Sequence, residues 1–208
     1  MRLGIFGGTF DPPHLGHLIL AEEARYRLNL ERLLWLLTPI SPFKTRVGIS
    51  SWEQRLELLQ AAIADNPGFE ISRVDIDRPA PHYAFESVKL IRDQHPEAEL
   101  VYLLGGDSLR DLPTWEQPEE LLAQLDQVGV MRRPDIPVDL EQLLTQLPGL
   151  ASRLTWVNAP LIDISGRTIR KNLREGAPVR YYLTEAVLRI IQEKKLYQVI
   201  SGDNAGKD

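Results

Sequence analysis

The sequence predicts an α/β protein built on one doubly wound, parallel sheet in a single domain. Short apolar runs alternate with segments of helical period from one end of the 208-residue chain to the other. Runs such as Leu33–Leu37 and Leu100–Leu104 are apolar at every position, as strands are when helices cover both faces of their sheet. The sequence shows no internal repeat of roughly 20–50 residues, which argues against a solenoid or propeller.

The apolar runs are the expected strands. They are Leu3–Phe6, Leu33–Thr38, Phe69–Asp77, Leu100–Leu104, Val128–Arg132 and Leu154–Val157. Segments with an apolar stripe at helical spacing are the expected helices. They are His14–Leu28, Trp52–Ala64, Tyr83–Gln94, Glu119–Leu125, Leu140–Leu147, Thr168–Arg174 and Glu185–Lys195.

Terminal signals support two of these helices and the end of the domain. Ser50 and Glu53 have the spacing of a capping box before the helix that starts at Trp52, and Thr184 can cap the last helix. We expect residues 1–200 to form one domain with a small C-terminal helical part. Residues 201–208 contain no apolar anchor and are expected to be a flexible tail.

Composition excludes several classes of protein. With 43% hydrophobic and 25% charged residues, the chain is an ordinary globular one. A net charge of −5 gives no general basic footprint for nucleic acid. The apolar runs are far shorter than the roughly 18 residues of a membrane span, and the first residues lack a secretory apolar region, so we expect a cytoplasmic protein. The absence of cysteine excludes disulfides, thiolate nucleophiles and Cys-ligated zinc.

The turn after the first strand carries the strongest functional signal, because ligands of open α/β sheets bind beyond the carboxyl ends of the strands. It reads Gly-Gly-Thr-Phe-Asp-Pro-Pro-His-Leu-Gly-His over residues 7–17. Glycines admit a polyphosphate, the following helix offers unpaired N–H groups, and His14 and His17 lie one turn apart on one face. Gly16 costs the helix about 1 kcal/mol, which suggests close approach of a ligand.

Two plainer interpretations of this turn remain. The histidines can simply decorate the start of a helix. They can also form a metal pair, against which stands the position of the other histidines, His82 and His95, outside obvious ligand spacing, together with the absence of cysteine.

These eleven residues resemble the (H/T)xGH signature of the nucleotidyltransferase superfamily and, in this full form, bacterial nicotinate-nucleotide adenylyltransferases. The resemblance implies a Rossmann-like fold and extends from Arg2 to about Tyr197. It implies that His14 and His17 hold the ATP phosphates and stabilise charge at the attacked α-phosphorus, with no covalent intermediate. Gly8, Thr9 and Phe10 would line the ATP site.

The turn after the second strand resembles a Pro-Pro-His-Lys or Pro-Pro-His-Arg segment of the family. Lys44 keeps the cation, for which the resemblance implies phosphate binding and a part in catalysis; alone, it would be read as a solvated loop lysine. Phe43 replaces an imidazole with a group that donates no hydrogen bond, so we expect weaker binding of the mononucleotide phosphate.

The turn after the fourth strand, Gly105 to Leu109, resembles the family's Gly-x-Asp-Ser-Leu. Gly105 and Asp107 would belong to the ATP site, where a carboxylate accepts hydrogen bonds from ribose hydroxyls; Asp107 can instead, or in addition, cap the following helix. Trp115 matches the tryptophan on which the family stacks the pyridine ring, although an isolated tryptophan usually packs in a core.

Two further segments complete the resemblance. Arg133 would give a planar fork to the mononucleotide phosphate, with an ordinary ion pair as the alternative. The segment from Ile164 to Arg170 resembles Ile-Ser-Ser-Thr-x-Ile-Arg, in which Ser165 and Arg170 would grip the β and γ phosphates of ATP, Arg170 with a catalytic role. This chain has Gly166 and Arg167 where Ser and Thr are usual; Arg167 would either bind ATP or point to solvent.

The implied reaction is attack by the phosphate of a pyridine mononucleotide on the α-phosphorus of ATP. Mg²⁺ would enter with the ATP phosphates, and no dedicated metal ligands are expected. Ala84 stands where Thr is common in a segment expected to bind the mononucleotide, and Glu116 would favour the nicotinamide form if it repels a nicotinate carboxylate. The rival interpretations are another transferase of the superfamily, such as one acting on phosphopantetheine, and a non-catalytic ATP-binding module. The sequence does not reveal an oligomeric state.

Overall fold

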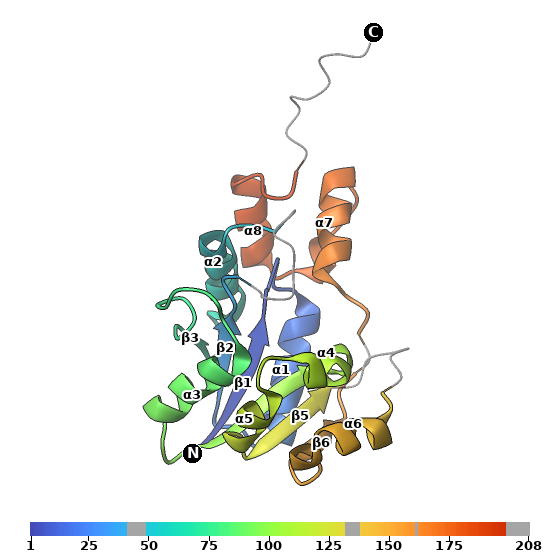
Figure 1. The fold of residues 1–208 in the computed structure, drawn as a ribbon. Helices are drawn as coiled ribbons and strands as arrows, with labels where there is room; N and C mark the ends of the chain where they lie inside the picture. The colour runs from blue at the N-terminus through green and yellow to red at the C-terminus, as the bar shows by residue number, and fades with distance from the viewer. Residues whose placement is uncertain (41–48, 132–137, 161, 199–208) are drawn as a thin grey trace.

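One parallel sheet organises the chain. The computed structural model describes residues 1–40, 49–131, 138–160 and 162–198. Its six strands lie in the order β3-β2-β1-β4-β5-β6, and every neighbouring pair is parallel (Figure 1). They are β1 (Arg2–Gly8), β2 (Arg32–Leu37), β3 (Phe69–Ser72), β4 (Glu99–Gly105), β5 (Gln127–Met131) and β6 (Leu154–Val157). The predicted doubly wound sheet is confirmed.

Helices connect the strands. They are α1 (Leu15–Arg27), α2 (Trp52–Ile63), α3 (Ala84–Gln94), α4 (Gly106–Asp111), α5 (Pro118–Ala123), α6 (Leu140–Gln146), α7 (Gly166–Glu175) and α8 (Glu185–Glu193). Short 3₁₀ turns are formed by Leu112–Thr114, Pro148–Leu150 and Arg180–Tyr182. Each helical segment expected from periodicity is present, and α4, which showed no periodic stripe, is added after β4.

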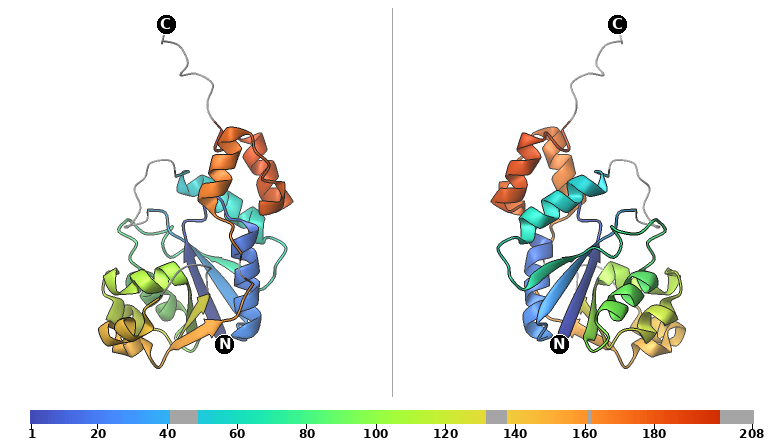
Figure 2. Two further views of the ribbon diagram at one scale, coloured as in Figure 1. Left: turned by 90° about the vertical axis from the view of Figure 1, so that its right-hand side faces the viewer. Right: turned by 90° about the vertical axis from the view of Figure 1, so that its left-hand side faces the viewer.

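The alternation of side chains along the strands divides the core into two layers. On β2, Leu33, Trp35 and Leu37 belong to one buried cluster, whereas Leu34 and Leu36 belong to the other. Helices α1, α2 and α8 contribute to the first cluster, and α3, α4 and α5 to the second. Figure 2 shows α1 on one side of the sheet and α3 and α5 on the other. Both faces of the parallel strands are therefore covered, as their composition predicts.

Two local predictions are wrong. The strand expected over Phe69–Asp77 ends at Ser72, because the chain turns at residues 74–77 and Arg73 pairs with Asp77 across that turn at 2.6 and 3.1 Å. The capping box of α2 is formed by Ser51 and Gln54, one residue beyond the expected pair. The Thr184 cap of α8 is present, with its side chain accepting from the N–H of Val187 at 3.3 Å.

The C-terminal helical part lies beside the ends of the central strands. Figure 1 shows α7 and α8 together with α2 at the end toward which β1 points. Lys194, just after α8, donates a hydrogen bond to Glu57 of α2. Residues 201–208, expected to be a flexible tail, lie outside the described residues. Within the described part of the chain, no helix combines the length and apolarity that a bilayer span requires.

Candidate functional site

A cleft of about 670 Å³ opens at the carboxyl ends of β1 and β4. Most of the residues singled out in the sequence line it. They are Gly8, Thr9, Phe10, His14, His17, Ala84, Gly105, Asp107, Trp115, Ser165 and Arg170. Lys44 and Arg133 lie outside the described residues, as do Phe43 and the turn after β5. The fold thus brings segments from across the whole chain to one opening.

The two histidines form the start of α1. His14 is the N-cap, and its Nδ1 accepts a hydrogen bond from the N–H of His17 at 3.3 Å. His17 Nδ1 in turn accepts from the N–H of His14 at 3.3 Å, and the rings stack with their centroids 3.6 Å apart. Because Nδ1 is an acceptor in both rings, each neutral imidazole carries its hydrogen on Nε2. The capping box therefore sets the tautomer that can donate to an anion.

Aromatic side chains support His17. Its ring meets the ring of Phe10 edge to face, with centroids 5.2 Å apart, and that of Phe6 at 6.1 Å. Phe10 has a φ of 49° and is 2% exposed, so the chain folds back sharply to bury it. A Cβ on Gly8 would lie 2.8 Å from that ring. Gly8 is therefore needed for Phe10 to take this place under the histidines.

The expectation for Gly16 is wrong. A Cβ on Gly16 would meet the ring of His14 at 3.0 Å and Ile164 at 3.5 Å, and Gly16 is not among the residues that line the cleft. The glycine makes room for the stacked histidine and for the segment before α7, rather than for a ligand.

Helix α7 brings polar groups to the same end of the cleft. Ser165 is its N-cap, and its Oγ accepts from the N–H of Thr168 at 3.2 Å. Arg170 lies one turn further along, with its Nη1 donating to the carbonyl oxygen of Asp11. Arg167 is exposed and lines the cleft, whereas Thr168, to which the resemblance gives no role, does not. An N-terminal helix end and two guanidinium groups make this region suited to an anion.

A mostly aromatic group of residues lines the cleft near the start of α3, together with the carboxylate of Asp75. The ring of Trp115 meets that of Tyr102 edge to face at 6.4 Å. Ala84 is the first residue of α3, whose N-cap residue, Tyr83, makes no side-chain capping bond. His82 is 5% exposed, its Nδ1 has no hydrogen-bond partner among the described residues, and burial lowers its pKa.

Two acidic residues, Asp107 and Glu116, do not have all the roles considered for them. Gly105 is the N-cap of α4 and Asp107 lies inside its first turn, so the capping role considered for Asp107 is wrong. Asp107 does line the cleft. Glu116 is exposed and is not among the described residues that line the cleft, which gives its repulsion of a carboxylate no structural support.

Arg55 was not identified from the sequence, and its side chain holds the turns beside the cleft in place. Its buried guanidinium donates to the carbonyl oxygens of Thr9 at 2.8 Å, Thr38 at 3.0 Å and Pro39 at 2.7 Å. Burial lowers the pKa of Arg55, and the charge of Asp11 opposes that shift. Arg55 thereby ties the turn after β1 to the turn after β2. The sequence signal that could have identified Arg55 is its position on the apolar face of α2, where a charged residue is unusual.

A second missed group is the pair of Asp75 and Arg78. Asp75 is 1% exposed, lines the cleft, and accepts from Ser87 at 2.6 Å and from Arg78 at 2.9 Å. Arg78 also donates to Glu86 at 2.7 Å and to the carbonyl oxygen of Pro81 at 2.9 Å. These contacts hold the loop that precedes α3. The incorrect extension of β3 to Asp77 hid this role.

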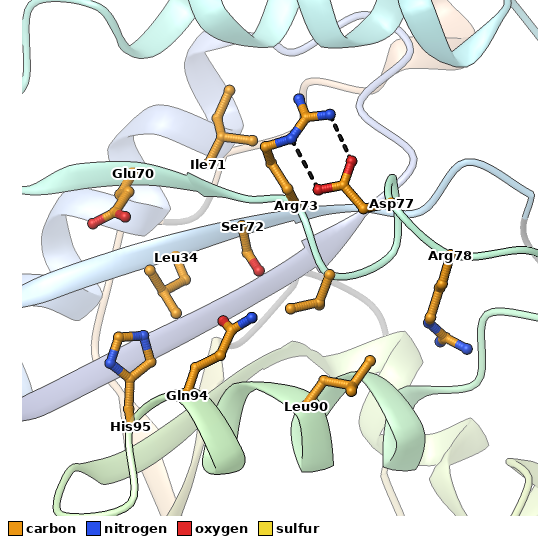
Figure 3. A pocket seen from close by; sticks show the side chains of 11 residues that line it. Leu34, Glu70, Ile71, Ser72, Arg73, Asp77, Arg78, Leu90, Gln94 and His95 are labelled. Atoms are coloured by element: carbon orange, nitrogen blue, oxygen red, sulfur yellow. Dashed lines mark hydrogen bonds and ion pairs between the residues drawn. The ribbon is translucent and has the colours of Figure 1, made fainter.

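A second hollow of about 490 Å³ lies beside β3 and α3 (Figure 3). Its charged groups include Arg73 and Asp77, which pair with each other, and none of the predicted site residues line it. Among the described residues, no cluster of three or more His, Asp or Glu side chains could hold a metal ion in either place.

Comparisons with known proteins agree with the geometry. Residues 5–172 match the model of a family described as cytidylyltransferase-like. The chain is 44% identical to a probable nicotinate-nucleotide adenylyltransferase of Thermomicrobium roseum, over 96% of this chain and 92% of that protein. It is 40% identical to a protein of the same description from Roseiflexus sp. (strain RS-1), over 94% and 98%.

Solved structures share the fold. A Plasmodium falciparum nicotinic acid mononucleotide adenylyltransferase complexed with NaAD superimposes with a TM-score of 0.76 and covers 94% of this chain and 97% of that one. The sequence identity in this pair is 18%, so the similarity concerns the arrangement of the elements.

Proposed function

The chain belongs to the nicotinate-nucleotide adenylyltransferase family of cytidylyltransferase-like proteins, and on this basis we propose the reaction that it catalyses. It joins nicotinate mononucleotide to the adenylyl group of ATP, giving nicotinate adenine dinucleotide and pyrophosphate in NAD biosynthesis. Both substrates are metabolites of the cell interior, so the proposal includes a cytoplasmic location.

The observation that carries the proposal is the stacked pair formed by His14 and His17, which both line the cleft. Each ring is fixed through Nδ1 by the capping box, which directs the hydrogen on Nε2 to other partners. Ser165 and Arg170 line the same cleft. Donors held in place before the reaction stabilise developing charge without reorganisation, and this is the usual source of catalysis in phosphoryl and nucleotidyl transfer.

The chemistry then follows from the charges of the substrates. An oxygen of the mononucleotide phosphate attacks the α-phosphorus of ATP, a new P–O bond forms, and the bond to the β-phosphate oxygen breaks as pyrophosphate leaves. The nucleophile is already an anion, so the protein supplies position and positive charge rather than a general base. Mg²⁺ arrives as part of the Mg-ATP substrate, held by phosphate oxygens. Lys44 and Arg133 complete the proposed set of phosphate-binding cations.

The opposite end of the cleft suits the pyridine ring. Trp115 offers a face for stacking, and the first turn of α3 offers the N–H groups that follow Ala84. An N-terminal helix end favours a carboxylate over a neutral amide, which supports nicotinate mononucleotide as the substrate. Nicotinamide mononucleotide is the alternative that Glu116 was expected to favour.

A direct assay tests the proposal. The purified protein is incubated with Mg-ATP and, separately, nicotinate mononucleotide, nicotinamide mononucleotide or phosphopantetheine, and pyrophosphate is measured together with the adenylylated product. We expect release with the two pyridine substrates and a higher kcat/KM for the nicotinate form. Release only with phosphopantetheine would move the protein to another branch of the superfamily. ATP binding without release in any mixture would identify a non-catalytic module.

A further inference from the structure

The carboxylate of Asp11 joins parts of the molecule that are far apart in sequence. Its Oδ1 accepts from the hydroxyl of Tyr197, in the C-terminal segment, at 2.7 Å. Its Oδ2 accepts from the N–H of Ser50, before α2, at 3.3 Å, and lies 3.5 Å from Nη1 of Arg170 on α7. The side chain of Asp11 is 2% exposed, so it is a buried charge whose stability depends on these partners.

These contacts hold Asp11 itself in place. Burial and the nearby carboxylate raise the pKa of Tyr197, so its hydroxyl remains a hydrogen-bond donor at neutral pH. The partners of the two oxygens come from separate elements, and the guanidinium of Arg55 adds a further buried positive charge nearby. The carboxylate is thus fixed from several sides, and Arg170 is the partner with the longest flexible side chain.

Arg170 is oriented by Asp11 twice. The same Nη1 that lies near the carboxylate also donates to the carbonyl oxygen of Asp11. Both contacts use one corner of the guanidinium, whose other N–H groups lie on Nη2 and Nε. An arginine fixed at one corner loses less conformational entropy when a phosphate binds at the others.

Gly166 allows the start of α7 to lie against the backbone of Asp11. A Cβ on Gly166 would lie 2.7 Å from the carbonyl oxygen of Asp11, which is a backbone atom and cannot move aside cheaply. Gly166 and Arg170 are four residues apart on α7 and therefore share a face, which here lies against Asp11. The departure from the serine usual in the family permits this direct contact.

We propose that Asp11 is a positioning residue, which fixes Arg170 for the triphosphate of ATP through a contact that Gly166 makes room for. The proposal rests on the proposed function, since it assigns Arg170 to ATP. Asp11 also precedes His14 by three residues in the chain. One side chain therefore sets the relative position of the catalytic turn and of α7.

Steady-state kinetics with Asp11→Asn test this role. The substitution keeps the shape and removes the charge, so we expect the KM for ATP to rise about tenfold and the KM for the mononucleotide to change less than about twofold. Asp77→Asn is the control for loss of an arginine–aspartate pair, since Asp77 pairs with Arg73 at an exposed position outside the cleft. It should change neither KM.

A double-mutant cycle separates positioning from general damage. In an Arg170→Gln background, Asp11→Asn should have little further effect on the KM for ATP, because the residue it positions is already absent. Gly166→Ala should raise the KM for ATP by displacing α7, and serves if Asp11→Asn does not fold. Equal rises in both KM values, additive effects in the cycle, or an unchanged KM for ATP would each overturn the proposal. If the wild type releases no pyrophosphate at all, the proposed function fails. The same variants are then compared by direct titration with Mg-ATP. An unchanged Kd for Mg-ATP in Asp11→Asn would overturn the positioning role.

Discussion

The two ends of the cleft are built in different ways. At the phosphate end, buried charges are held by backbone groups and by one another: Arg55 donates to carbonyl oxygens, and Asp11 accepts from Tyr197 and lies near Arg170. At the pyridine end, Trp115 and Tyr102 meet edge to face and His82 is a buried ring with a lowered pKa. In the proposed reaction, the first end meets the negative charge of the phosphates and the second stacks against the pyridine ring.

This difference determines which substrate each variant should affect. Charge at the phosphate end acts on a reacting centre, where fixed donors lower the barrier. Aromatic area at the pyridine end acts on binding, since stacking is equally present before and during the reaction. Variants at the first end should therefore change kcat or the KM for ATP, and variants at the second end the KM for the mononucleotide.

The largest effect is expected where the phosphate end meets the core. Arg55→Met leaves several carbonyl oxygens without a donor, each at a cost of about 1 kcal/mol or more, so the free energy of unfolding should fall by about 3 kcal/mol. Urea denaturation followed by circular dichroism measures it. The exposed Arg73→Met is the matched control and should cost less than about 0.5 kcal/mol. An equal fall in the free energy of unfolding in the two variants would show that the buried contacts of Arg55 add no stability beyond that of an exposed arginine.

Replacing His17 by Ala should lower kcat by about 10² or more, because it removes a donor fixed in place before the reaction. The KM for each substrate should change by less than about threefold. His95→Ala, in the second hollow, is the control and should leave turnover unchanged. Activity of His17→Ala within twofold of the wild type would refute a role in the transition state.

At the pyridine end, Trp115→Ala should raise the KM for nicotinate mononucleotide about tenfold, since stacking of a base on an aromatic ring is worth about 1–3 kcal/mol. The KM for ATP should stay within about twofold. Trp115→Phe keeps an aromatic face and should give an intermediate value. A uniform loss of kcat without a change in either KM would mean that Trp115 only packs against its neighbours in the core.

The smallest effect concerns the protonation of His82 at this end. Because burial lowers the pKa of His82, the unfolded chain binds its proton more readily than the folded one, so this contribution to stability is present above the unfolded pKa of about 6.5 and is lost as the pH falls below it. The charges that act on the ring are Asp75, Arg78 and Glu86. His82→Gln should reduce the loss of unfolding free energy between pH 7 and pH 5. An identical pH dependence in the variant would show that other groups cause it.

At the phosphate end, the sequence predicted the motif but missed Arg55. The eleven residues from Gly7 to His17 are contiguous, so one motif contains the glycines, the helix start and both histidines. The role of Gly16 within this motif was predicted incorrectly. Gly16 accommodates the ring of His14, and this contact depends on a rotamer that sequence spacing does not reveal.

The pyridine end is assembled from separate segments, and its supports depend on long-range contacts. Asp75 was expected in the strand Phe69–Asp77, yet the chain turns at residues 74–77 and Arg73 pairs with Asp77 there. Helix α4 was not among the expected helices because it shows no periodic stripe, although its N-cap, Gly105, is an acceptable capping residue. The fold class and the strand positions can be predicted from the periodicity of apolar residues. The contacts between loops cannot, because they depend on which loops lie together in the folded chain.

One measurement tests the central claim that the cleft couples the two nucleotides directly. Enzyme at substrate-like concentration is mixed rapidly with Mg-ATP labelled at the α-phosphate, with and without nicotinate mononucleotide, and label is followed in the protein, the dinucleotide and free AMP. We predict that pyrophosphate appears only when both nucleotides are present and that the label passes into the dinucleotide alone. Labelled protein, or a burst of pyrophosphate from ATP in the absence of the mononucleotide, would contradict the account.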